Sequence, residues 1–300
     1  MQDDRLDQAR LLVANYVEPY LGMPLGAAKA VKSVRFEAGR PLVEVELGFP
    51  AGGYVNTLAA ELQALLRQAP GLGDATVTVG WQVATHVAQG QLQPLPGIRN
   101  VIAVASGKGG VCKSTTAVNL ALALAIDGAR VGRLDADIYG PSQPRMMGLQ
   151  GERPVSHDGK RLQPLAAHGI KVMSIGFLIE EEQPMVWRGP MVTQALQQLL
   201  NDTDWGELDY LIVDMPPGTG DIQLTLSQRV PVSGAVVVTT PQDIALLDAR
   251  KGLRMFQKVN VPVLGIVENM STHVCSNCGH EEPIFGSGGG VRMAEQYGVS

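Results

Sequence analysis

Six short apolar runs lie in the last two thirds of the chain, and segments with helical spacing of apolar residues separate them. The runs cover residues 101–106, 131–135, 170–175, 210–214, 234–239 and 263–268. Strands buried on both faces of a parallel sheet are nearly continuous apolar runs, and helices form the crossovers between them. The pattern therefore predicts an α/β fold with a doubly wound parallel sheet, and it places ligands at the carboxyl ends of the strands.

The first 88 residues have a different pattern. Residues 30–36 and 42–47 alternate apolar and polar positions, as in antiparallel strands with one buried face. Amphipathic helices are predicted over 6–16 and 55–68, and a further strand over 75–79. We therefore predict a small α+β domain over 1–88, a linker rich in Gln, Pro and Gly over 89–97, and the large domain over 98–300.

Composition and charge argue against a nucleic-acid-binding protein and against a membrane protein. The chain has 300 residues, of which 45% are apolar, and its net charge is -5. It has no cluster of Lys and Arg, so we do not expect it to bind nucleic acid. No apolar run approaches the roughly 18 residues that a membrane span needs, and the polar start does not resemble a signal peptide. With only three cysteines, the sequence predicts a cytoplasmic protein in a reducing compartment.

A phosphate-binding loop follows the first apolar run of the large domain. The segment nearly fits the pattern G-x-x-x-x-G-K-[ST], in which backbone N–H groups wrap the phosphates of a nucleotide, the lysine reaches the terminal phosphates and the hydroxyl holds Mg²⁺. The loop consists of Gly107, Lys108, Gly109, Gly110, Val111, Cys112, Lys113, Ser114 and Thr115. A glycine-rich turn without a ligand is the alternative, but the strand before the loop and the helix predicted after it favour nucleotide binding.

Carboxylates stand where two of the predicted strands end. Asp135 and Asp137 close the run at 131–135, and Asp214 closes the run at 210–214. In phosphate-loop proteins one such carboxylate holds Mg²⁺ or its water, and a second positions the attacking water. We predict that Asp214 is on the Mg²⁺ side of the site. The alternative is that these residues only cap the turns that follow the strands.

Two cysteines with C-x-x-C spacing, Cys275 and Cys278, follow the last predicted strand. A metal cluster or a tetrahedral metal usually takes four protein ligands, so one chain offers half a set and two chains offer a whole one. A zinc site that adds His273 and His280 is a second possibility. A redox motif is less favoured, because the segment after Cys278 does not have the pattern of a helix.

Several motifs of the large domain together resemble the Mrp/ApbC family of iron–sulfur cluster carrier ATPases. The resemblance covers about residues 96–300, and the first 87 residues resemble a small domain associated with iron–sulfur assembly. The motifs are the phosphate loop, Asp-Ala-Asp-Ile-Tyr-Gly-Pro-Ser (135–142), Trp-Arg-Gly-Pro-Met (187–191), Asp-Met-Pro-Pro-Gly-Thr-Gly-Asp (214–221), Thr-Thr-Pro-Gln (239–242) and Glu-Asn-Met-Ser (268–271).

The resemblance implies a homodimer that binds and hydrolyses ATP with Mg²⁺, assembles a [4Fe–4S] cluster between its protomers and passes it to apo-proteins, with the help of cluster assembly factors. It implies that Lys108 reaches the nucleotide of the partner protomer and that Asp137 is the switch carboxylate. It also implies phosphate and Mg²⁺ contacts, an adenine contact and cluster ligands from Lys113, Ser114, Thr115, Asn269, Cys275 and Cys278. The other functions considered are a MinD-like regulatory or positioning ATPase with a structural zinc site, and a nucleotide-impaired interaction module.

The chain departs from the family pattern at two positions of the nucleotide site. Cys112 replaces a glycine whose backbone must adopt a conformation that a Cβ atom disfavours, and the strain, roughly 1–3 kcal/mol, is expected to weaken nucleotide binding and hydrolysis. Arg133 replaces an aliphatic residue in a strand predicted to be buried on both faces, where an unpaired charge is costly. The family also continues beyond the position of Ser300, so we expect a C-terminal truncation.

Overall fold

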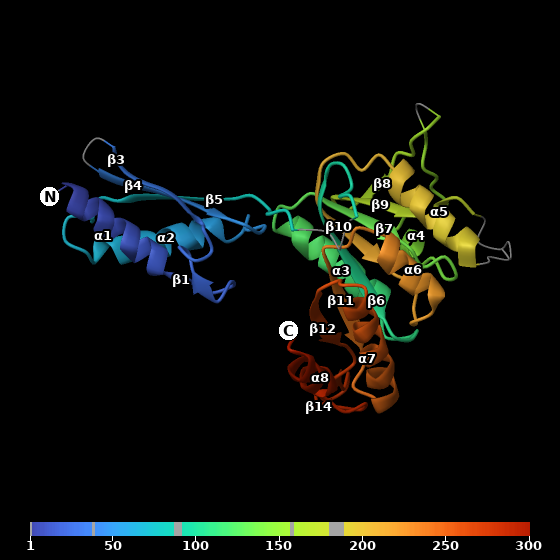
Figure 1. Ribbon diagram of the computed structural model, residues 1–300. Helices are drawn as coiled ribbons and strands as arrows, with labels where there is room; N and C mark the ends of the chain where they lie inside the picture. Colours follow the sequence, from blue (N-terminus) through green and yellow to red (C-terminus); the bar gives the residue numbers. More distant parts are fainter. Residues whose placement is uncertain (1, 38–39, 87–91, 157–158, 180–188) are drawn as a thin grey trace. The chain divides into compact units, whose positions relative to one another are not determined.

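The computed structural model describes residues 2–37, 40–86, 92–156, 159–179 and 189–300. The chain forms two compact units, one of residues up to 84 with 126–129, the other of residues 85–125 and 130–300 (Figure 1). Residues 89–91 of the predicted linker, and Trp187 and Arg188 of the family motif at 187–191, lie outside the described residues.

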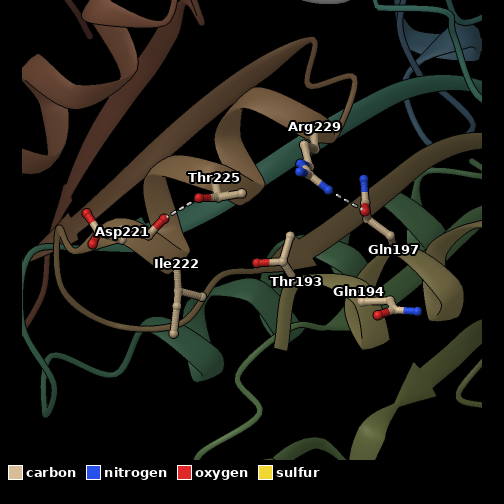
Figure 2. A pocket seen from close by; sticks show the side chains of 7 residues that line it. All are labelled: Thr193, Gln194, Gln197, Asp221, Ile222, Thr225 and Arg229. Atoms are coloured by element: carbon tan, nitrogen blue, oxygen red, sulfur yellow. Dashed lines mark hydrogen bonds between the residues drawn. The ribbon is translucent and has the colours of Figure 1, made fainter. Parts of the chain in front are cut away.

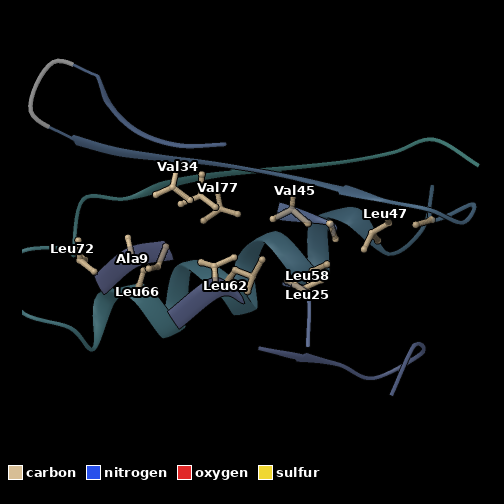
Figure 3. Close-up of a cluster of buried hydrophobic side chains, with 14 residues drawn as sticks. Ala9, Leu25, Val34, Val45, Leu47, Leu58, Leu62, Leu66, Leu72 and Val77 are labelled. Carbon is tan, nitrogen blue, oxygen red and sulfur yellow. The ribbon is translucent and has the colours of Figure 1, made fainter. Parts of the chain in front are cut away.

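The small unit packs two helices on one face of a three-stranded sheet. The sheet has the order β3-β4-β5, with β3 and β4 antiparallel, as predicted, and β4 and β5 parallel. Its core places Leu58, Leu62 and Leu66, one helical turn apart, against the inward side chains of the sheet (Figure 3). The elements are α1 (Gln2–Asn15), β1 (Val17–Glu18), β2 (Met23–Pro24), β3 (Val31–Glu37), β4 (Arg40–Leu47), α2 (Val55–Arg67) and β5 (Thr76–Trp81).

A seven-stranded sheet forms the centre of the large unit, with the order β12-β11-β6-β10-β7-β9-β8. Six strands are parallel, which confirms the predicted doubly wound sheet. The seventh, β8, pairs antiparallel with β9 and was not predicted, because its three residues carry too short a pattern. The strands are β6 (Ile98–Ser106), β7 (Val131–Asp135), β8 (Leu165–Ala167), β9 (Ile170–Ser174), β10 (Leu208–Asp214), β11 (Gly234–Thr239) and β12 (Val263–Glu268).

Helices connect the strands of this sheet. They are α3 (Lys113–Ile126), α4 (Gln143–Met146), the short 3-10 helix η1 (Ile175–Phe177), α5 (Gly189–Asp202), α6 (Asp221–Arg229), α7 (Asp243–Lys258) and α8 (Gly289–Tyr297). A two-stranded hairpin, β13 (His273–Val274) and β14 (Glu281–Glu282), separates β12 from α8. Among the described residues, none of the helices has both the length and the apolar character needed to cross a membrane.

Strand register brings the predicted site residues to one edge of the sheet. β6 is flanked by β10 on one side and β11 on the other, so the chain changes direction across the sheet at the strand that precedes the phosphate loop. On β10, Asp214 pairs in register with Asp135 of β7 and Val104 of β6. The carboxylates that end these strands therefore lie beside the loop that follows β6.

Candidate functional site

The phosphate loop joins β6 to the first residue of α3, Lys113, and its backbone explains two of its glycines. A Cβ atom on Gly107 would lie 2.2 Å from backbone atoms of Asp248 on α7, so the loop and this helix could not pack so closely with any other residue. Gly110 has a φ of +79°, a left-handed conformation that glycine adopts without strain. The hydroxyl of Ser106 donates to the carbonyl of Lys108 at 2.8 Å and closes the start of the loop.

Cys112 has the backbone conformation that the sequence predicts to be unfavourable for it. Its φ is +60°, in the left-handed region, and its side chain is exposed. The carbonyl of Cys112 accepts hydrogen bonds from the backbone N–H and the hydroxyl of Thr116, at 3.0 and 3.1 Å, and so begins α3. The loop therefore keeps the shape that a glycine would allow freely, at a cost of order 1–3 kcal/mol.

The loop encloses a cavity of 360 Å³, a volume within the range of small-molecule sites. Lys108 lines it, and within the described part of the chain the ammonium of this residue has no hydrogen-bond or ion-pair partner. The cavity brings together eight of the predicted nucleotide-site residues and Asp137. It is lined by Ser106, Lys108, Gly109, Gly110, Val111, Cys112, Lys113, Ser114, Thr115, Asp137, Gly140, Ser142, Met146 and Pro217.

Asp214 lies beneath this cavity rather than in its wall, and its carboxylate is completely buried. One oxygen, Oδ1, accepts a hydrogen bond from the ammonium of Lys113. The other, Oδ2, accepts from Arg133 Nη2 at 3.2 Å and from Gln143 Nε2 at 3.1 Å. Both oxygens of the predicted Mg²⁺-side carboxylate are therefore held by side chains of the protein.

Arg133 is completely buried, as its place in β7 predicts, but it is not unpaired. Besides Asp214, its Nη2 donates to the backbone carbonyl of Ser114 at 3.1 Å, whereas Nε and Nη1 have no hydrogen-bond partner among the residues that the structure describes. Burial lowers the pKa of Arg133 to about 10, and the charges of Asp214 and Asp135 oppose that shift. Arg133 is therefore charged at neutral pH.

Asp135 and Gln143 belong to the same buried network; the sequence indicated Asp135 as a strand-end carboxylate without assigning it a role, and it did not indicate Gln143. Burial, reinforced by the charge of Asp214, raises the pKa of Asp135 to about 7. Asp135 accepts hydrogen bonds from the N–H groups of Asp137 and Gln143, at 3.1 and 3.2 Å, and from the hydroxyl of Ser174 at 3.0 Å. The Asp135 carboxylate therefore fixes the segment that carries Asp137 into the cavity. Burial also raises the pKa of Asp137, whose carboxylate lies 3.9 Å from the Lys113 ammonium.

Asn269, expected to contact adenine, lies beside the phosphate loop. Its Nδ2 donates to the carbonyl of Val111 at 3.3 Å, and its Oδ1 accepts from the N–H of Met270 at 2.9 Å. Its backbone N–H donates to the carbonyl of Thr239 at the end of β11. The residue thus ties the segment after β12 to the loop, while an adenine contact stays a prediction.

The two cysteines occupy the turn of the β13–β14 hairpin, where Cys275 is half-buried and Cys278 exposed. The N–H groups of Asn277 and Cys278 point at the sulfur of Cys275 and hold the pKa of its thiol below the usual value, which favours the thiolate that metals require. Gly279 donates to the carbonyl of Cys275 at 2.8 Å and has a φ of +71°. Both thiols are free and lie near solvent.

Glu268, the last residue of β12, anchors both ends of the segment that carries this hairpin. Its carboxylate accepts from the hydroxyl of Ser271 at 2.8 Å and from the N–H groups of Gly288 and Gly290 at 2.8 and 2.5 Å. Burial acts to raise the pKa of Glu268, but these hydrogen bonds outweigh it and hold the pKa below its usual range. The sequence motif contained Glu268, but no spacing rule indicated these contacts.

A second cavity, of 540 Å³, lies between α5 and α6 (Figure 2). Across it, Arg229 donates to Oε1 of Gln197 at 2.9 Å. Its lining residues are Thr193, Gln194, Gln197, Asp221, Ile222, Thr225 and Arg229. The cavity is larger than the one at the phosphate loop, and none of the predicted nucleotide-site residues lines it.

Comparisons with known proteins identify the family of this chain. A family model described as NUBPL iron-transfer P-loop NTPase matches residues 97–300, and one described as iron-sulfur cluster assembly protein matches residues 8–79. An iron-sulfur cluster carrier protein of Pseudomonas fragi is 62% identical over 239 residues, 79% of this chain and 83% of that protein. One from Escherichia coli K12 is 53% identical over 289 residues, 95% of this chain and 77% of the relative.

Among solved structures, a nucleotide-binding protein from Archaeoglobus fulgidus in complex with ADP superimposes with a TM-score of 0.60. It is 41% identical, and the match covers 68% of this chain and 80% of that one. The family model spans more than half of the chain, over the domain that contains the phosphate loop and the cysteine hairpin. The chain therefore belongs to the NUBPL iron-transfer P-loop NTPase family, which confirms the resemblance to the Mrp/ApbC carriers that its motifs indicated.

Proposed function

We propose that the protein is an ATP-hydrolysing iron–sulfur cluster carrier, which assembles a [4Fe–4S] cluster between two protomers and transfers it to apo-proteins. The observation that carries the proposal is the pair of free, accessible thiols of Cys275 and Cys278, on a hairpin that begins a few residues after Asn269 touches the phosphate loop. The relatives named as cluster carriers support it. Cluster assembly factors are further expected partners, and a cytoplasmic location stays a prediction.

ATP would occupy the cavity of the phosphate loop. Its phosphates would accept hydrogen bonds from the backbone N–H groups of residues 107–115 and from the ammonium of Lys113. Lys113 must leave Asp214 to reach them. The oxygen donors beside the loop suit Mg²⁺, which prefers oxygen ligands. The hydroxyl of Ser114 and the carboxylate of Asp137 line the cavity, and Oδ1 of Asp214 becomes available once Lys113 moves. Bound Mg²⁺ would neutralise charge on the phosphates.

Hydrolysis requires a water in line with the terminal phosphate. Asp137 lines the cavity and is held by the hydrogen bond from its N–H to Asp135, so its carboxylate can orient that water. We propose that Lys108, which has no partner within the described part of its own chain, acts on the nucleotide of the partner protomer. A cation there would stabilise charge that develops in the transition state.

Ligand counting supports a cluster shared between two chains. Within the described ranges, no three His, Cys, Asp or Glu side chains of one chain are placed to hold a metal ion. Nδ1 of His273 lies 3.6 Å from a carboxylate oxygen of Glu282, its partner across the hairpin. Exposed apolar side chains on the same segment, Val274, Ile284 and Phe285, offer a surface that a second protomer can cover.

Two other functions stay open to experiment. A MinD-like regulatory or positioning ATPase would need a structural zinc site within one chain, for which His273 and His280 were the candidates. A nucleotide-impaired interaction module is favoured by one observation, the left-handed conformation of Cys112. A carrier differs from both in the iron it binds and in the metal ligands it needs.

Replacing Cys112 with glycine should tighten ATP binding about tenfold, because relief of 1–3 kcal/mol of strain corresponds to roughly five- to a hundredfold in affinity. Titration calorimetry with ATP measures this. Cys112→Ser is the matched control: it removes the thiol but keeps a Cβ atom, so its affinity should match that of the unmodified protein. Equal affinities for all three proteins would refute the strain argument.

The two loop lysines should affect different steps. Lys113→Ala should weaken ATP binding, whereas Lys108→Ala should reduce turnover more than binding, as expected of a charge that acts on the transition state. A mixture of the two variants should regain about a quarter of the normal ATPase activity, since half of the dimers are mixed and each of these has one complete site. No recovery from two inactive variants would contradict a role of Lys108 across the dimer.

Anaerobic reconstitution with iron and sulfide should give about four iron atoms per dimer and a coloured protein. Cys275→Ser or Cys278→Ser should lose the iron but keep nucleotide affinity, while Cys112→Ser, the matched control, should keep both. Iron analysis, absorption spectra and sedimentation measure these outcomes. A colourless protein with about one zinc per chain, lost when His273 or His280 is replaced, would instead favour the regulatory ATPase.

A further inference from the structure

Below the nucleotide site, in the middle of β7, lies the buried guanidinium of Arg133. Its side chain has no exposed surface, and its neighbours in register on the flanking strands are Ile212 and Val172. A charge in such a place is retained only with an anionic partner, because the free energy of burying it alone is prohibitive. That partner is Asp214.

The contacts of Arg133 join the two parts of the site that must stay in place when a nucleotide binds. One nitrogen, Nη2, reaches both Oδ2 of Asp214 at 3.2 Å and the carbonyl of Ser114, in the first turn of α3, at 3.1 Å. Gln143 donates to the same carboxylate oxygen at 3.1 Å. Oδ1 is left to Lys113. Asp214 is thus oriented with one oxygen fixed and one facing the lysine that a phosphate would attract.

Arg133 changes the balance of charge around Asp214 when a nucleotide binds. When Lys113 turns to a phosphate, Asp214 loses one of its two cations and would become an uncompensated buried anion if Arg133 were aliphatic. The other carboxylates near it are Asp135, completely buried, and Asp137, in the cavity wall. Without Arg133, Asp214 and Asp137 would face Lys113 alone and would repel the anionic nucleotide unless Mg²⁺ accompanied it. With Arg133 present, the protein itself supplies a second permanent cation.

We propose that Arg133 is a positioning residue that serves as the resident counter-cation of Asp214, so that nucleotide binding to this protein depends little on Mg²⁺. The inference rests on the proposed nucleotide site. Binding of nucleotide and binding of Mg²⁺ are linked, so a fixed cation that takes over part of the role of Mg²⁺ must reduce the effect of each on the other.

The test measures the affinity for ADP by titration calorimetry, once with millimolar Mg²⁺ and once with EDTA. For the unmodified protein the two dissociation constants should agree within about threefold. In Arg133→Met, which keeps the length but not the charge, removal of Mg²⁺ should weaken binding by at least about tenfold. Arg133→Lys should behave nearly as the unmodified protein, because the charge is retained.

Arg130→Met is the matched control, since Arg130 directly precedes β7 but pairs with Asp209, at 3.0 Å, away from the loop. Its Mg²⁺ dependence should equal that of the unmodified protein. The inference is overturned if the unmodified protein itself loses tenfold or more of its affinity in EDTA, a result that needs no folded variant, or if Arg133→Met shows the same ratio as the unmodified protein. Absence of ADP binding in both buffers would overturn the nucleotide site and this inference together.

Discussion

The buried carboxylate of Asp214 is the constraint on which the geometry of the nucleotide site depends. A carboxylate without exposed surface costs several kcal/mol unless cations and hydrogen-bond donors surround it, and here they come from three separate elements. Lys113 opens α3, Arg133 lies within β7 and Gln143 opens α4. Satisfying one anion therefore fixes the first turn of the helix after the phosphate loop against the neighbouring strand and the segment that follows it.

The nucleotide site and the cysteine hairpin are joined through the residues that follow β12. Asn269 donates to the carbonyl of Val111 in the phosphate loop, and Glu268, its neighbour, binds both Ser271 and the start of α8. The segment with Cys275 and Cys278 is therefore held at both ends, and the residue after Glu268 contacts the phosphate loop. Such a connection is what a carrier needs if the nucleotide state is to influence cluster binding or release.

The sequence predicts those features of the protein that depend on single residues or on short segments. Continuous apolar runs predict the parallel strands, and the glycine pattern predicts both the loop and the strained conformation of Cys112, because φ preferences belong to single residues. What depends on register across strands could not be predicted in this way. Arg133 was expected to be costly, and only the pairing of β7 with β10 reveals its partner Asp214. The contacts of Glu268 with Gly288 and Gly290 join residues about twenty positions apart, beyond any spacing rule.

A crystal structure of the protein with ADP and Mg²⁺ would test the account most directly, because it locates the two cations that now share Asp214. We predict that the ammonium of Lys113 lies on the β-phosphate and has left Oδ1 of Asp214, while Arg133 Nη2 still lies within hydrogen-bonding distance of Oδ2 and of the Ser114 carbonyl. A bound nucleotide with Lys113 still on Asp214, or with Arg133 displaced from the carboxylate, would contradict it.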